Sequence, residues 1–162
     1  RKLFGIKDNY FLHFTSKGRM ALFHIISHVI KKKKRVLLSS FTIFDLINIV
    51  KSAGGEPVFI DQKKNSFELD EYLVKKECDK NDVGAIILTH YSLNSNNLEI
   101  IRKICKDKNI ALIQDLAISP FSRFKQKSLI EYSDYSFFSF GTFKFVSIFF
   151  GGALTNTPIL KL

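Results

Sequence analysis

The chain has 162 residues, 46% of them hydrophobic, which is enough for one ordinary domain with a buried core and excludes a disordered chain. Its 25 basic and 15 acidic residues give a formal net charge of +10, which would attract phosphates, nucleic acid or anionic lipid alike. Two cysteines, without Cys-x-x-Cys or Cys/His ligand spacing, exclude a disulfide framework and give no support to a metal site. We therefore expect no metal and a reducing compartment, the cytoplasm.

The two ends of the chain and one apolar stretch bear on export and membrane insertion. The chain opens with Arg1 rather than Met, shows no signal-peptide pattern and ends in an apolar stretch, so we expect a piece of a longer protein. Residues 135–154 carry one charge, Lys144, near the middle, where a charge costs about 2.5–3.5 kcal/mol on membrane-insertion scales. Aromatic and β-branched residues cut by glycines favour buried strands and loops there, so we predict no membrane partner.

Helix-like and strand-like segments alternate along the chain. In chain order the patterns predict a helix over residues 18–30, a strand over 35–38, a helix over 41–53, a strand over 57–60, a helix over 69–77, a strand over 85–88, a helix over 96–106, and strands over 110–113, 135–138 and 152–155. Short, fully apolar strands separated by amphipathic helices are typical of βαβ units with both faces of the sheet covered. The predicted fold class is α/β, a mostly parallel sheet flanked by helices.

Polar residues follow the predicted strands, where open parallel sheets bind their ligands. Residues 39–42, Asp61, residues 89–92 and Asp115 come directly after strands, and Lys144 comes five residues after Ser139. Because consecutive parallel strands end at the same edge, we expect the carboxylate of Asp115 and the amine of Lys144 to lie near one another.

Each of these two groups has a functional and a structural interpretation. Lys144 stands between Phe143 and Phe145, and a lysine that loses hydration favours the neutral amine, the nucleophilic form that Schiff-base lysines need. The alternative is a lysine that reaches water from a strand end. Asp115 could face the pyridine nitrogen of pyridoxal phosphate (PLP), or could cap a turn. Local context leaves both questions open.

Two basic segments could bind anions. Gly18 and Arg19 open the first predicted helix, whose free N–H groups are an anion site, although Ser16 could instead cap this helix. Residues 31–35 are five basic residues after a helix, which favours a solvated turn. A nucleic-acid-binding α/β domain is an alternative that rests on net charge alone, so we predict no nucleic-acid partner.

Six sequence segments, taken together in chain order, indicate a family more specifically than any single residue does. They are Gly18-Arg19-Met20-Ala21-Leu22, Leu38-Ser39-Ser40-Phe41-Thr42, Gly54-Gly55-Glu56-Pro57-Val58-Phe59-Ile60-Asp61, Ala85-Ile86-Ile87-Leu88-Thr89-His90-Tyr91, Ile113-Gln114-Asp115-Leu116-Ala117, and Ser133-Asp134-Tyr135-Ser136-Phe137-Phe138-Ser139-Phe140 followed by Lys144 and Gly151-Gly152-Ala153. Together they resemble the DegT/DnrJ/EryC1/StrS family of PLP-dependent sugar aminotransferases, which have the aspartate aminotransferase-like fold (fold type I). In that family the Schiff-base lysine follows a Phe-Ser-Phe strand and precedes a Gly-Gly pair by the spacing that Lys144 has.

The resemblance implies a role for each matching position. It implies that Lys144 binds PLP as a Schiff base and shuttles a proton, that Asp115 pairs with the pyridine nitrogen, that the N–H groups of Gly18 and Arg19 hold the phosphate with the Ser139 hydroxyl, and that Thr42 lines the ring face. The implied reaction moves an amino group from an amino acid, typically glutamate, to a keto-sugar nucleotide in aminosugar or polysaccharide biosynthesis. It also implies that residues 1–162 are a single, truncated PLP-binding large domain without its C-terminal small domain, and a homodimer at full length.

Several positions depart from the family pattern. Ser39 stands where Pro is usual, and residues 90–93 read His-Tyr-Ser-Leu where His-x-x-Gly is usual. Ile118 stands where Gln or His is usual, Ile43 where an aromatic residue is usual, and Phe150 where an acidic residue is usual. These positions motivate an alternative, a decayed or non-catalytic member that serves as a cofactor- or partner-binding module. A PLP sugar dehydratase is a further alternative, but its relatives carry His in place of the lysine, so Lys144 argues against it.

Overall fold

The computed structural model describes residue 4, residues 6–91 and residues 97–156. Its elements in chain order are β1 (Phe11–Thr15), α1 (Gly18–Val29), β2 (Arg35–Ser39), α2 (Phe44–Ser52), β3 (Glu56–Ile60), α3 (Glu71–Cys78), β4 (Val83–Thr89), α4 (Leu98–Lys108), β5 (Ala111–Asp115), β6 (Arg123–Phe124), β7 (Lys127–Ser128), the 3₁₀ helix η2 (Leu129–Tyr132), β8 (Tyr135–Ser139) and β9 (Gly152–Asn156).

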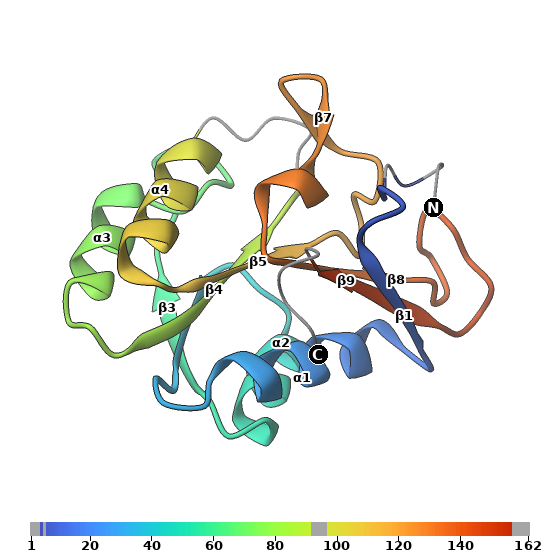
Figure 1. Cartoon of the computed structure of the whole chain (residues 1–162), viewed down its shortest axis with the longest axis horizontal. Helices are drawn as coiled ribbons and strands as arrows, with labels where there is room; N and C mark the ends of the chain where they lie inside the picture. Colours follow the sequence, from blue (N-terminus) through green and yellow to red (C-terminus); the bar gives the residue numbers. More distant parts are fainter. Residues whose placement is uncertain (1–3, 5, 92–96, 157–162) are drawn as a thin grey trace.

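A seven-stranded sheet runs through the molecule in the order β1-β9-β8-β5-β4-β2-β3 (Figure 1). Neighbouring strands from β8 to β3 are parallel, whereas β9 is antiparallel to both β8 and β1. β6 and β7 form a separate small hairpin. The predicted fold class, a mostly parallel sheet flanked by helices, is confirmed.

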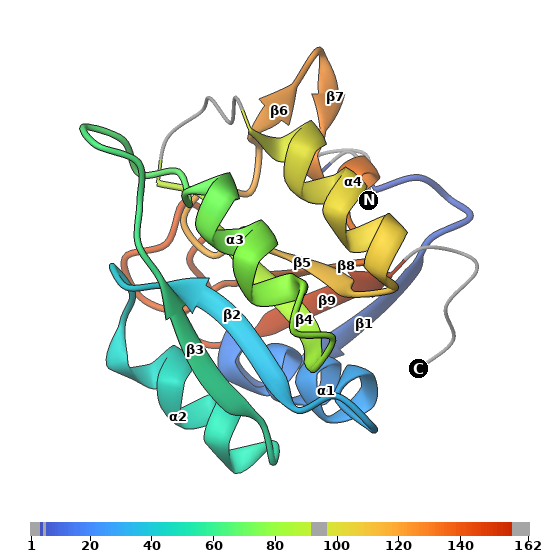
Figure 2. The ribbon, with the colours of Figure 1, turned by 90° about the vertical axis from the view of Figure 1, so that its left-hand side faces the viewer.

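Helices cover both faces of this sheet, α1 and α2 on one side and α3 and α4 on the other (Figure 2). Leu22 and Ile26 of α1 pack in one buried apolar cluster with β2, β4 and β8, whereas Ile101 of α4 packs in the second cluster. Strand β4 is an interior strand, between β5 and β2, and is buried along its length except at Thr89. Burial on both faces explains why this strand reads as a continuous apolar run.

Some boundaries differ from the prediction. The helix expected from residue 41 begins at Phe44, because the N–H of Phe41 donates to the Ser39 hydroxyl at 3.0 Å and so closes a turn after β2. Helix α4 begins and ends two residues later than predicted, and residue 96 lies outside the described residues. Strand β1, the hairpin and η2 were not predicted at all.

The apolar stretch considered for membrane insertion is not helical. Residues 135–154 contain β8, a loop and the first part of β9, as predicted. Within the described ranges, the structure contains no helix with the length and apolar character that a membrane crossing requires.

Candidate active site

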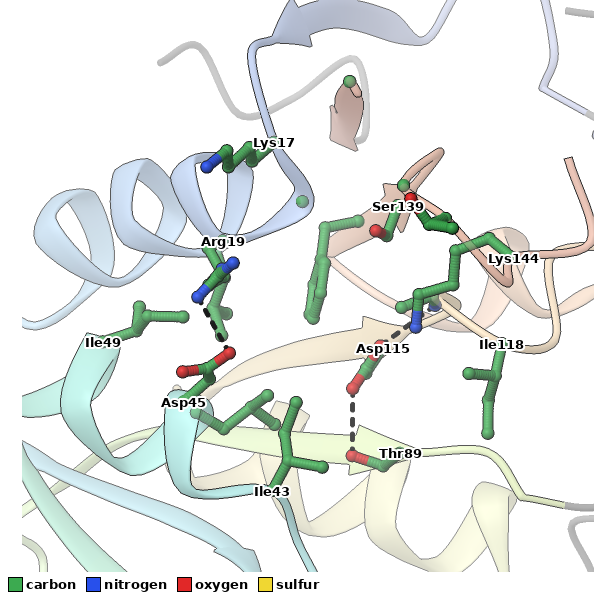
Figure 3. A pocket seen from close by; sticks show the side chains of 18 of the residues that line it. Lys17, Arg19, Ile43, Asp45, Ile49, Thr89, Asp115, Ile118, Ser139 and Lys144 are labelled. Atoms are coloured by element: carbon green, nitrogen blue, oxygen red, sulfur yellow. Dashed lines mark hydrogen bonds and ion pairs between the residues drawn. The ribbon is translucent and has the colours of Figure 1, made fainter. Parts of the chain in front are cut away.

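A pocket of about 390 Å³ opens at the carboxyl ends of β5 and β8, beside the N-terminus of α1 (Figure 3). Such a volume lies within the range of small-molecule sites. All six predicted site residues line it, namely Gly18, Arg19, Thr42, Asp115, Ser139 and Lys144. The sheet therefore brings together residues that are up to 126 positions apart, from Gly18 to Lys144, as the strand-end argument predicted.

Asp115 lies at the floor of the pocket, at the end of β5, and is only 4% exposed. One carboxylate oxygen accepts the N–H of Ala117 at 3.0 Å and the other accepts the hydroxyl of Thr89 at 3.2 Å. Burial raises the pKa of Asp115 above its ordinary value, while these two hydrogen bonds and the nearby Lys144 ammonium oppose the rise. The bond to Ala117 shows that Asp115 stabilises a turn as well as facing the pocket.

Lys144 lies in the loop between β8 and β9, and its side chain extends into the pocket toward Asp115 (Figure 3). The lysine is half-buried. The prediction that Phe143 and Phe145 desolvate it is wrong, because these side chains are 98% and 77% exposed. The pocket wall, and not the neighbouring phenylalanines, surrounds the amine.

The N-terminus of α1 forms one end of the pocket, with Lys17, Gly18 and Arg19 among the lining residues. Its first turn contains no acidic residue, and Lys17, not Ser16, is the N-cap residue and makes no side-chain cap, so the predicted alternative of a Ser16 cap is wrong. A Cβ on Gly18 would lie 2.8 Å from the Cβ of Ser139, so backbone and hydroxyl are neighbours. Unsatisfied N–H groups at a helix start favour a phosphate or carboxylate.

The side chain of Arg19 makes a contact that the sequence did not predict. Its Nη1 donates to Asp45 of α2 at 2.9 Å across the pocket rim (Figure 3). Both side chains are about half exposed, so solvent screens the pair and it adds little to stability.

The remaining wall combines apolar side chains with hydroxyl groups. Ile43, Ile118 and Phe150, three of the departures from the family pattern, all line the pocket. The buried hydroxyl of Thr42 has no hydrogen-bond partner within the described residues, which leaves it available to a ligand.

Among the other residues that line the pocket are Thr89 and Tyr91, for which no role was predicted from the sequence. Both come directly after the strand predicted at residues 85–88, so the strand-end rule already contained the signal that could have found them.

Comparison with known proteins identifies the family of the chain. The sequence profile of the DegT/DnrJ/EryC1/StrS aminotransferase family matches residues 14–160. The chain belongs to this family. Similar curated proteins include UDP-4-amino-4,6-dideoxy-N-acetyl-beta-L-altrosamine transaminase from Campylobacter jejuni, 34% identical over 127 residues that make up 77% of this chain and 34% of the relative. GDP-perosamine synthase from Escherichia coli O157:H7 is 26% identical over 148 residues, 90% of this chain and 40% of the relative.

Solved structures share the fold. Helicobacter pylori PseC, an aminotransferase of pseudoaminic acid biosynthesis, superposes with a TM-score of 0.83 at 21% identity, over 96% of this chain and 41% of that one. The protein Spr1654 from Streptococcus pneumoniae, in its PLP form, superposes with a TM-score of 0.82 at 18% identity. The match covers 90% of this chain and 41% of that one. The fold is therefore that of fold-type I aminotransferases, as predicted. The chain spans less than half the length of these relatives.

Proposed function

We propose that the chain is the cofactor domain of a PLP-dependent aminotransferase that transfers an amino group from an amino acid to a keto-sugar nucleotide in aminosugar biosynthesis. The observation that carries the proposal is the meeting of Lys144 and Asp115 in one pocket. Membership of an aminotransferase family and relatives named as sugar transaminases support it.

The residues present fit PLP. The start of α1 and the Ser139 hydroxyl suit a phosphate, the buried carboxylate of Asp115 suits a protonated ring nitrogen, and Lys144 supplies an amine. The close approach of Gly18 to Ser139 leaves no room for a side chain at the phosphate end. The unpartnered Thr42 hydroxyl offers a further hydrogen bond.

Each side chain then has a task derived from its surroundings. PLP, when bound, supplies an electron sink for the bond that breaks beside the transferred nitrogen. The carboxylate of Asp115, fixed by Thr89 and Ala117, holds a proton on the ring nitrogen, and a cation there offsets the burial that raises the pKa of this carboxyl. Lys144 is the base that moves a proton at the carbon bearing the amino group. Ile43 and Ile118 supply apolar side chains to the wall of this pocket.

Absorption spectroscopy of the full-length protein tests the proposal. Added PLP is expected to give the visible band of a lysine-bound cofactor, which glutamate bleaches and which Lys144→Ala abolishes. The absence of a band in the wild type would contradict the proposal. A band without amino transfer to any of a panel of keto-sugar nucleotides would instead favour the decayed member that Ile118 and Ile43 suggested.

The wider setting belongs to the same proposal. Residues 1–162 would form the PLP-binding large domain of a longer enzyme, since the relatives are more than twice as long. A homodimer at full length is supported by large apolar side chains around the pocket mouth, because Phe44, Phe145 and Phe149 are more than 70% exposed. The cytoplasm is supported by two buried cysteines that are free thiols, Cys78 and Cys105.

A further inference from the structure

Three aromatic rings from three different loops meet beside the pocket. Phe41 follows β2, Phe67 lies between β3 and α3, and Tyr91 follows β4. The ring centroids are 5.3 Å apart for Phe41 and Tyr91, 5.6 Å for Phe67 and Tyr91, and 5.8 Å for Phe41 and Phe67. Each ring therefore packs against the other two. We call this set the aromatic cluster.

The aromatic cluster is held in place and yet open to solvent. The hydroxyl of Tyr91 donates to the backbone carbonyl of Phe41 at 2.9 Å, and the side-chain amide of Gln62 donates to the carbonyl of Phe67 at 3.3 Å. Even so, the side chains of Phe41 and Phe67 are 55% and 53% exposed. Exposed apolar groups that gather in one patch mark a binding surface more often than scattered ones do.

The aromatic cluster lies between two recesses. Tyr91 also lines the pocket of Lys144, and Phe67 also lines a second recess of about 670 Å³. Apart from Phe67 this second recess is polar, with Asp61, Gln62 and Asn65 among its lining residues. Within the described part of the chain, the carboxylate of Asp61 has no hydrogen bond or ion pair. Flat apolar faces and free hydrogen-bonding groups are thus adjacent.

We propose that the aromatic cluster stacks the nucleobase of the sugar nucleotide while the second recess binds the polar edge of that base. The inference rests on the proposed function and names a subsite for its substrate. A nucleobase has two π-faces and a rim of N–H and carbonyl groups, so it needs aromatic side chains beside acceptors such as Asp61. Ribose and diphosphate separate the base from the sugar, so adjoining recesses suit the two ends of one substrate.

The polar recess also decides between a nucleobase and a second protein chain. An apolar protein surface on the aromatic cluster would cover Asp61 and remove its water without supplying a donor. A base supplies ring or exocyclic N–H groups at that position. The combination therefore favours the base.

Binding of UDP and GDP to the full-length protein tests the subsite, with inorganic pyrophosphate as the probe without a base. We expect saturation-transfer NMR signals from the base protons, and we expect Phe67→Ala to weaken the better-bound nucleotide about tenfold, the loss of one base–aromatic stack, without changing pyrophosphate affinity. Phe14→Ala is the matched control, since Phe14 is 76% exposed on β1, at the other edge of the sheet. Asp61→Asn is expected to change the ratio of UDP to GDP affinity, because it replaces an acceptor by a donor.

Several results would overturn the subsite. The subsite is refuted if the wild-type protein binds neither nucleotide, or if Phe67→Ala and Phe14→Ala have the same nucleotide affinity. It is also refuted if Phe67→Ala dissociates a dimer in sedimentation, because the aromatic cluster would then be a subunit contact. The PLP band is recorded on the same samples. A normal band with unchanged nucleotide affinity in Phe67→Ala refutes only the subsite, whereas a missing wild-type band with base-dependent binding refutes only the proposed reaction.

Discussion

Gly18 permits the close contact between the start of α1 and the end of β8, and Gly18→Ala perturbs it directly. The new Cβ would lie 2.8 Å from the Cβ of Ser139, 3.0 Å from the carbonyl oxygen of Phe138 and 3.2 Å from the Cα of Ser139. Ordinary contact begins at 3.4 Å, so the two segments must separate by about 0.6 Å, and no rotamer change relieves a clash with backbone. Overpacking of this kind costs about 1–3 kcal/mol, while the better helix propensity of Ala returns at most about 1 kcal/mol.

We therefore expect Gly18→Ala to lower the free energy of unfolding by about 1–2 kcal/mol and to weaken PLP binding, because the phosphate-binding N–H groups move away from Ser139. Urea unfolding and PLP titration measure the two effects. Gly141→Ala is the matched control in the same pocket, since its nearest atom would be 3.8 Å away. If Gly18→Ala were as stable as Gly141→Ala and bound PLP as tightly, the cradle would be wrongly assigned.

Three other predictions follow from the charges and thiols. Lys144→Ala should abolish the visible PLP band while changing the free energy of unfolding by less than about 0.5 kcal/mol, because the half-exposed amine has no hydrogen-bond partner within the described residues; a band that persists contradicts the Schiff-base role. Thr89→Val should raise the pKa of Asp115 further, because it removes the hydroxyl that donates to this carboxylate, and Thr89→Ser should restore the pKa; carbon NMR of the carboxyl measures both. In the ligand-free protein, the stability that comes from the raised pKa is present below pH 3.8 and is lost as the pH rises through the pKa of the folded state. Burial raises the pKa of Cys78 from 9.0 to about 11, so the stabilising contribution of this thiol should be complete below pH 9.0 and disappear as the pH rises toward 11. Because Cys78 and Cys105 are both buried, iodoacetamide should label them only after unfolding, which mass spectrometry measures.

The sheet could be predicted from the sequence because its central strands are buried on both faces. β2 and β4 contain the apolar runs Val36–Leu38 and Val83–Leu88, which favour short strands covered on both faces. β1 could not be recognised, since it lies at an edge, most of its residues are exposed or half-exposed, and its only partner in the sheet is β9, at the far end of the described chain. A pairing so distant in sequence leaves no local pattern.

The sequence could predict those site residues that directly follow strands, because the strand ends fix their positions. Lys144 and Asp115 share an edge because the strands that precede them are parallel neighbours. The pairing of Arg19 with Asp45 depends on how α1 packs on α2, which residue spacing does not specify. Phe143 likewise has a backbone φ of 65°, a left-handed conformation that its sequence neighbours do not predict.

The contact of Gly151 and Gly152 with the start of α1 has a consequence for biosynthesis. The N–H of Gly151 donates to the carbonyl of Ser16 at 2.8 Å, and a Cβ on Gly152 would lie 2.4 Å from the nitrogen of Gly18. The turn at the start of α1 can therefore make this contact only after Gly151 has been translated, 133 residues later than Gly18. A nascent chain halted before Gly151 would lack the contact.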